Sequence, residues 1–67
     1  MKKYLLVIEV DRVGADGRYI TTKNQVVEGN PYKWFEQFKA EHDYESVNSW
    51  LKHTLINWLK MPEAGGE

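Results

Sequence analysis

The sequence contains no cysteine. This absence excludes disulfide bonds and thiolate metal sites, two devices that commonly supplement the thin core of a small domain. A chain of 67 residues has room for one domain, and a domain of that size buries only about 60% of the surface that its unfolded chain exposes. The remaining sources of stability are dense aromatic packing, for which the chain has three Trp, four Tyr and two Phe, and a partner.

A surplus of charge of one sign is also lacking, because nine Lys and Arg face ten Asp and Glu. A dedicated nucleic-acid-binding domain normally has a basic surplus on one face. The balance therefore argues against that class, and equally against an acidic mimic of DNA.

Long hydrophobic runs are missing as well. The apolar stretch that begins at Tyr4 ends at Glu9, which is too short for the core of a signal peptide or for a membrane span. We interpret residues 4–10 as a strand that is apolar on both faces and therefore lies inside the structure. Without a targeting segment or cysteine, the sequence favours a cytoplasmic protein with no membrane contact.

The next segment predicts a β-hairpin. The pair Asp16-Gly17 readily supplies the positive φ angles of a tight turn. Residues 19–27 then form a more polar second strand, and we expect its Ile20, Thr22 and Val26 side chains to meet the core. The preceding loop, from Asp11, resembles a calcium loop only faintly and is interpreted as a turn.

A helix is expected to begin at Asn30-Pro31, since Asn is a preferred N-cap and Pro fits the first helical position. Trp34, Phe35 and Phe38 follow at helical spacing, and His42 continues the same face.

Residues 47–60 predict a second helix, capped by Asp43 or Ser46 and stopped at Pro62. Apolar or small side chains recur there at steps of three and four, a pattern typical of an amphipathic helix: Val47, Trp50, Leu51, Thr54, Leu55, Trp58 and Leu59. The predicted fold is therefore α+β with the order ββαα, in one domain over 1–61 with a disordered tail over 62–67.

Two features qualify the second helix. Its apolar arc spans about 180°, with Ile56 outside even that arc, whereas a helix packed on one side needs about 100°. The helix then either wedges between the first helix and the sheet or meets another molecule. In addition, a two-stranded hairpin is marginal alone, so either an exposed edge pairs with another chain or the C-terminal segment adds a third strand.

The sequence offers no convincing set of catalytic residues. Ser46 and Ser49 are the candidate nucleophiles, and His53 follows Ser49 by four residues, but no oxyanion site is evident. The paired carboxylates Glu9 and Asp11 are interpreted as a solvated strand end. We expect no enzymatic activity.

No metal or cofactor is expected either. The two histidines, His42 and His53, are eleven residues apart and lack the spacing of a zinc site. We expect His42 to lie at the carboxyl end of the first helix, where a positively charged side chain is favoured.

Protein–protein interaction is the function that remains, because Tyr and Trp are enriched at interface hot spots. Three large side chains lie outside the main apolar faces of their elements and are candidates for exposure: Tyr19, Tyr32 and Ile56. Four acidic residues cluster around the predicted junction of the two helices: Glu36, Glu41, Asp43 and Glu45. We predict a small non-catalytic module that acts as an inhibitor, adaptor or accessory factor on a larger protein complex. Many phage and mobile-element proteins that block host machinery have this size and style, an analogy only.

The alternative is nucleic-acid binding by the hairpin, as a dimer. Five of the nine basic residues lie in the first third of the chain, and Tyr4 and Tyr19 offer stacking faces beside them: Lys2, Lys3, Arg12, Arg18 and Lys23. Self-assembly into a homodimer is a further possibility that the sequence leaves open.

Overall fold

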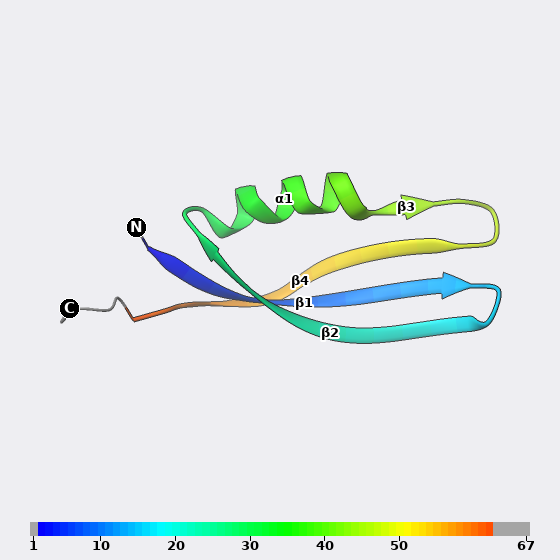
Figure 1. Cartoon of the computed structure of the whole chain (residues 1–67), viewed down its shortest axis with the longest axis horizontal. Coiled ribbons are helices and arrows are strands. Elements are labelled where there is room, and N and C mark those ends of the chain that lie inside the picture. Colours follow the sequence, from blue (N-terminus) through cyan, green and yellow to red (C-terminus); the bar gives the residue numbers. More distant parts are fainter. Residues whose placement is uncertain (1, 63–67) are drawn as a thin grey trace.

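The computed structural model, which describes residues 2–62, is a four-stranded antiparallel sheet with one helix (Figure 1). The elements in chain order are β1 (Lys3–Gly14), β2 (Gly17–Glu28), α1 (Pro31–His42), β3 (Tyr44–Glu45) and β4 (Trp50–Lys60). The strand order β2-β1-β4-β3 places β1 between two other strands, but only its Leu6 and Ile8 face is buried, although both faces were expected inside the structure. The molecule is long and narrow, 50 × 19 × 13 Å.

The predicted hairpin is confirmed, but its turn is only the two residues Ala15-Asp16, because residues 11–14, expected in the turn, belong to β1. Gly14 pairs with Gly17, and Gly17 has a φ of 122°, in the left-handed region that favours glycine. The expected orientation of the second strand is wrong, because Ile20 and Val26 are 55% and 47% exposed while Val27 is 4% exposed. The short turn fixes the register, and a shift of one residue exchanges the two faces of a strand.

The first predicted helix is confirmed. The Asn30 side chain accepts hydrogen bonds from the backbone N–H groups of Tyr32 and Lys33 at 2.9 and 3.1 Å, so it caps α1 as expected. Pro31 and Phe35 are the buried residues of this helix.

Replacing the cap tests how much α1 depends on it. Asn30→Ala should lower the free energy of unfolding by about 1 kcal/mol, because two backbone donors lose their acceptor, whereas Asn30→Gly should cost only a few tenths. Urea unfolding followed by circular dichroism measures both variants. A loss near zero for Asn30→Ala would show that the side-chain cap contributes nothing.

The core lies between α1 and one face of the sheet. Leu6 and Ile8 of β1 are fully buried, and Val27 of β2 and Phe35 of α1 complete the buried cluster. Half-buried side chains surround it: Tyr4, Trp34, Phe38, Leu55 and Trp58. Within residues 2–62, a buried cluster of four side chains makes a thin core, so stability rests on few contacts.

The predicted second helix is wrong, and with it the order ββαα. Residues 44–60 form β3 and β4, so the order is ββαββ, close to the alternative in which the C-terminal segment adds a strand. Ser46, expected as a helix cap, closes the turn into β4 instead, where its backbone N–H donates to the Ser49 carbonyl at 2.8 Å. Val47, expected on the apolar helix face, is 97% exposed in this turn.

A β-bulge explains why this strand looks helical in sequence. The pairing of β1 with β4 shifts between Val7 and Ile8, which leaves Ile56 as an extra residue. The residues on the helix side of β4 are therefore Leu51, His53 and Leu55, followed after a step of three by Trp58. Because Trp50 and Leu59 on the opposite face are also apolar, the combined spacing imitates a helical period.

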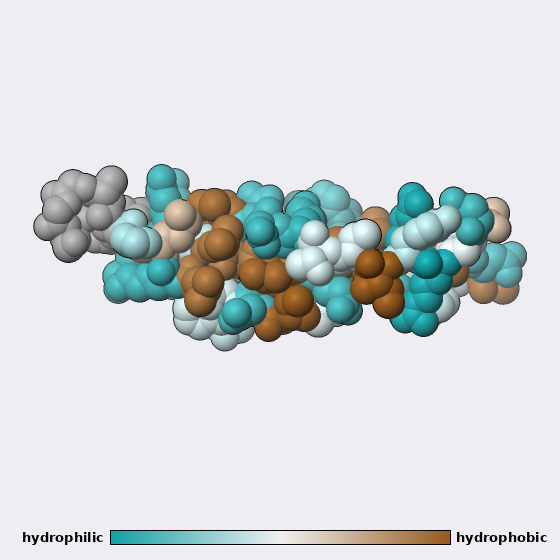
Figure 2. Space-filling view, turned by 90° about the horizontal axis from the view of Figure 1, so that it is seen from below, coloured by the Kyte–Doolittle hydropathy of each residue, from teal (hydrophilic) through white to brown (hydrophobic). Residues whose placement is uncertain are grey.

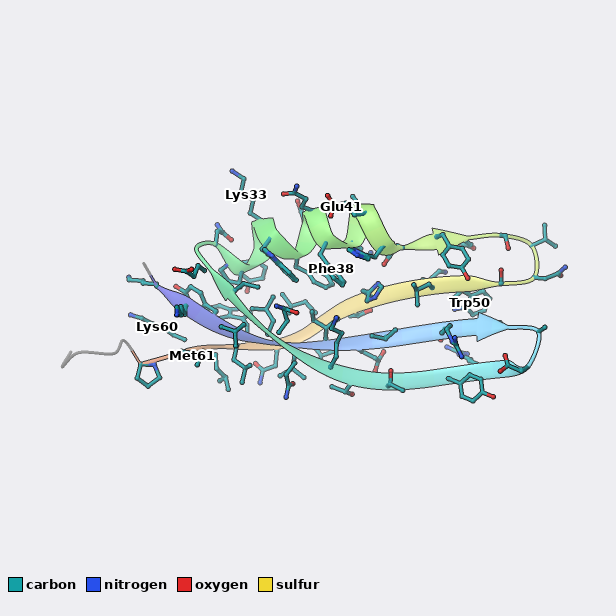
Figure 3. All side chains as sticks on the ribbon, in the orientation of Figure 1. Lys33, Phe38, Glu41, Trp50, Lys60 and Met61 are labelled. Atoms are coloured by element: carbon teal, nitrogen blue, oxygen red, sulfur yellow. The ribbon has the colours of Figure 1, made fainter. Side chains whose placement is uncertain are left out.

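The helix covers only part of the sheet. In Figure 1, α1 lies over the half of the sheet near the described ends of the chain, and it stops where β3 begins. Phe38 points from α1 toward the sheet, whereas Lys33 and Glu41 point away from it (Figure 3). The hairpin end of the helix side is thus uncovered.

Candidate protein-interaction surface

The register of the sheet aligns four side chains in a row across all four strands. Arg12 of β1 is paired with Tyr19 of β2 and with Leu51 of β4, and Leu51 is paired with Tyr44 of β3. Directly paired residues of antiparallel strands share a face. Arg12 is four residues after the buried Ile8 in the same strand, so the two side chains point to the same face of the sheet. The four residues Tyr19, Arg12, Leu51 and Tyr44, which we call the tyrosine row, therefore lie on the helix side, beyond the end of α1.

The tyrosine row is exposed and carries one positive charge. Tyr19 and Tyr44 are 46% and 51% exposed. The Arg12 guanidinium lies 5.5 Å from the centre of the Tyr19 ring, a cation–π arrangement, and within residues 2–62 it forms no ion pair. The Tyr19 hydroxyl donates to the Asp16 carbonyl at 3.3 Å, which fixes that ring over the end of the hairpin.

A buried histidine anchors the sheet beside this row. His53 is 6% exposed, and its Nδ1 lies 2.6 Å from a carboxylate oxygen of Asp43. Its ring meets Phe38 edge-on, with the ring centres 4.9 Å apart. Since Asp43 directly follows α1 and also lies 3.9 Å from Lys39, these contacts fix the end of the helix against β4.

On the opposite face of the sheet, at the same hairpin end, the charges of Arg18 and Asp11 neutralise each other. Arg18 donates two hydrogen bonds to Asp11 at 3.0 and 2.9 Å. The Arg18 hydrogen bond lowers the pKa of the Asp11 carboxyl, and that carboxyl raises the pKa of Arg18. Trp50 lies near both, at the hairpin end (Figure 3). The buried indole N–H of Trp50 has no hydrogen-bond partner in the described part of the chain. Its proximity to Asp11 nevertheless helps to lower the pKa of that carboxyl.

The predicted apolar and aromatic interface residues are all exposed, but they do not form one surface. Tyr32 is 57% exposed and packs on Trp58, whose indole N–H donates to the Tyr32 hydroxyl at 2.6 Å. Ile56 is 51% exposed at the bulge of β4. Only Tyr19 belongs to the tyrosine row.

The predicted acidic cluster is divided by ion pairs. Asp43 is occupied by His53, and Glu45 lies 3.4 Å from Lys52. Glu36 and Glu41 are exposed on α1, where Lys33 and Lys39 balance their charge.

The basic residues of the nucleic-acid alternative are divided between the two faces. Arg12 and Lys23 are on the helix side, with Lys23 over the Phe38 ring at 5.1 Å. Lys3 and Arg18 are on the opposite face, and Lys2 precedes β1. The structure therefore does not bring the five together in one basic footprint.

The candidate catalytic and metal-binding side chains have other contacts. The Ser49 hydroxyl lies 2.9 Å from that of Ser46, whereas His53 is bonded to Asp43. The rings of His42 and His53 lie 6.4 Å apart, and both contact Phe38, His42 by stacking and His53 edge-on. Among residues 2–62 there is no group of three or more His, Asp or Glu that could hold a metal ion.

Sequence reasoning missed Tyr44 and Leu51 as site residues. The cluster depends on β3 and β4, which the sequence pattern presents as a helix. The two tyrosines are 25 residues apart in the chain, and only the sheet register aligns them. A strand interpretation of residues 50–60 would have been the signal needed to find them.

Comparison with known proteins gives no relative. No family model matches the chain, no curated protein is similar to it, and no solved structure resembles it. Over residues 2–62, no helix has both the length and the apolar composition that a membrane crossing needs.

Proposed function

We propose that this protein is a small non-catalytic binding module that docks on a larger protein through the tyrosine row. The observation that carries the proposal is the alignment of two exposed tyrosines and an arginine without an ion pair on one uncovered part of the sheet. Tyr and Arg are among the residue types that dominate binding energy at protein interfaces. Rings held on a rigid sheet also lose little conformational entropy when they bind.

The positive charge of Arg12 in the tyrosine row indicates the chemistry of the partner. Arg12 presents a planar set of donors beside apolar ring faces, a combination that suits a carboxylate held bidentately. The partner we propose is therefore a protein surface with an acidic side chain flanked by apolar groups. Binding of this kind fits an inhibitor, adaptor or accessory factor.

A protein partner is favoured over nucleic acid. Affinity for nucleic acid rests on several basic residues that contact one phosphate backbone, and here the five candidates are on both faces of the sheet. Arg18 is in addition paired with Asp11.

The absence of catalysis is part of the proposal. It is supported by the contacts of the candidate groups, because Ser49 and His53 each bond to a different neighbour. General acid–base or nucleophilic chemistry needs these groups within hydrogen-bond reach of each other.

The test is capture of a partner by the tagged protein from a lysate of its source, with and without nuclease, followed by titration of the purified partner. Arg12→Glu and Tyr44→Ala should each weaken binding by about thirtyfold or more, the effect of an interface hot spot. Lys33→Glu is the matched control, since it reverses an exposed charge on the outer face of α1 (Figure 3) and should leave binding unchanged.

Two results would overturn the proposal. Equal binding by wild type and Arg12→Glu would show that the tyrosine row is not the interface. Capture that disappears after nuclease treatment would make nucleic acid the partner.

A further inference from the structure

The face of the sheet opposite α1 is not covered by any helix or strand within residues 2–62. At the end near the described termini it carries an apolar row, in which Leu5 is paired with Val26 and with Leu59. Val7 lies on the same face two residues further along β1. Val26 and Leu59 are 47% and 53% exposed. These four residues form the open-face patch, and Figure 2, seen from below Figure 1, shows apolar surface gathered toward this end of the molecule.

We propose that the open face is the interface of a homodimer, in which the open-face patches of two copies pack on each other. This inference does not depend on the proposed function. The tyrosine row lies on the other side of the sheet, so a dimer leaves both copies of it free.

The thin core is the first argument for a second copy. Domains of fewer than about 70–80 residues usually add a disulfide, a metal or an oligomeric contact to their core. The chain has no cysteine, and its described residues offer no group of metal ligands. Beside its aromatic packing, oligomerisation is the device that remains, and another copy of the chain is always present with it.

The charges of the open face are the second argument. Its basic and acidic residues nearly balance: Lys3, Arg18 and Lys52 against Glu9, Asp11, Glu28 and Glu45. A second copy is therefore not repelled, whereas a strongly charged partner such as nucleic acid gains little.

The arrangement of charges beside the patch is also self-complementary. Lys3 and Glu28 are paired on neighbouring strands, next to the pair Leu5 and Val26. A two-fold axis parallel to β1 and β2, placed between the two stacked sheets, brings each Lys3 against Glu28 of the other copy. The same operation brings Leu5 against Val26, as an isologous contact requires.

The contact area is at the small end for a specific dimer. The two-fold axis stacks β1 and β2 of one copy on β2 and β1 of the other, and two strands at a spacing of about 4.8 Å, with about 3.4 Å per residue, project to roughly 10 × 40 Å. A standard interface buries about 800 Å² per partner. Two sheets with the same twist pack face to face at about −30°.

The experiment is sedimentation equilibrium on the full chain from micromolar to millimolar concentration. The wild type should show the mass of two chains. Val26→Lys should weaken association by about thirtyfold or more, because it places a charge in the apolar contact. Leu59→Lys should weaken it less, because Leu59 of β4 lies at the rim, beside β2 of the other copy. Val47→Lys is the control, since Val47 is 97% exposed in the turn before β4, and it should remain dimeric. Circular dichroism shows whether each variant is folded.

A charge exchange adds a readout that loss of folding does not imitate. Lys3→Glu and Glu28→Lys should each weaken the homodimer, and an equimolar mixture of the two variants should associate again. In that mixed dimer both contacts between the copies join opposite charges, whereas the pair within each chain stays like-charged. A monomeric wild type at millimolar concentration would overturn the proposal. So would a dimer that survives Val26→Lys but is lost in Thr22→Pro, because that result assigns association to the free edge of β2.

Discussion

Ile8→Ala should lower the free energy of unfolding by about 3 kcal/mol, within the range measured for truncation of buried aliphatic side chains. Ile8 is fully buried in β1 and belongs to the cluster of Leu6, Val27 and Phe35. Truncation leaves a cavity that this thin core has few neighbours to fill. Because the net stability of so small a domain is roughly 3–5 kcal/mol, much of the protein should be unfolded at 37 °C.

Ile20→Ala is the matched control for this substitution. Ile20 is also a strand residue, but it is 55% exposed on the open face of β2, so the same change should cost less than about 1 kcal/mol. Urea unfolding is measured for both variants at a concentration at which the wild type is monomeric. If the two losses were equal, burial against α1 would not be the source of stability.

The sequence was sufficient for the elements of the first half of the fold, though not for the orientation of β2, because its signals for those elements are local. The turn between β1 and β2 depends on a glycine with positive φ, and α1 depends on the Asn30 cap and the adjacent proline. Each signal acts within a few residues, so no knowledge of tertiary contacts is needed to interpret it.

The second half depends on tertiary contacts. The bulge at Ile56 exists only because β4 pairs with β1, and without that pairing the spacing of Leu51, Leu55 and Trp58 matches a helix equally well. Two signs pointed to a different structure: the excess width of the apolar arc, with Ile56 outside it, and the marginal stability of a two-stranded hairpin alone. Both candidate surfaces share this limit, since Tyr44 and Leu59 reach their surfaces through the register of β3 and β4.

The register also predicts which single-residue deletions the chain tolerates. Asn24 of β2 and Asn57 of β4 are both paired with Val7, and the bulge residue Ile56 directly precedes Asn57. On the β2 side the ladder is regular from Lys3 to Gly14. Deletion of Asn24 therefore moves one half of β2 to the opposite face of the sheet, because the side-chain period of a strand is two.

Deletion of Asn24 should lower the free energy of unfolding by at least about 2 kcal/mol. The chain then either turns Val27 out of the core, where full burial of a valine contributes about 1.5–3 kcal/mol, or breaks the two-residue turn that closes at Gly17. Urea unfolding measures the loss, and hydrogen exchange of the Val27 amide shows which half has moved.

Deletion of Ile56 is the matched control, because Ile56 lies next to Asn57, which pairs with Val7 from the other side of β1. It removes the extra residue, so Leu55 and Asn57 keep their partners Ile8 and Val7 in a regular ladder. Its cost should stay below about 1 kcal/mol, since Ile56 lies outside the core cluster. A loss as large as that of the Asn24 deletion would show that the bulge itself is required, for instance to give β4 the twist that brings Trp58 under Tyr32.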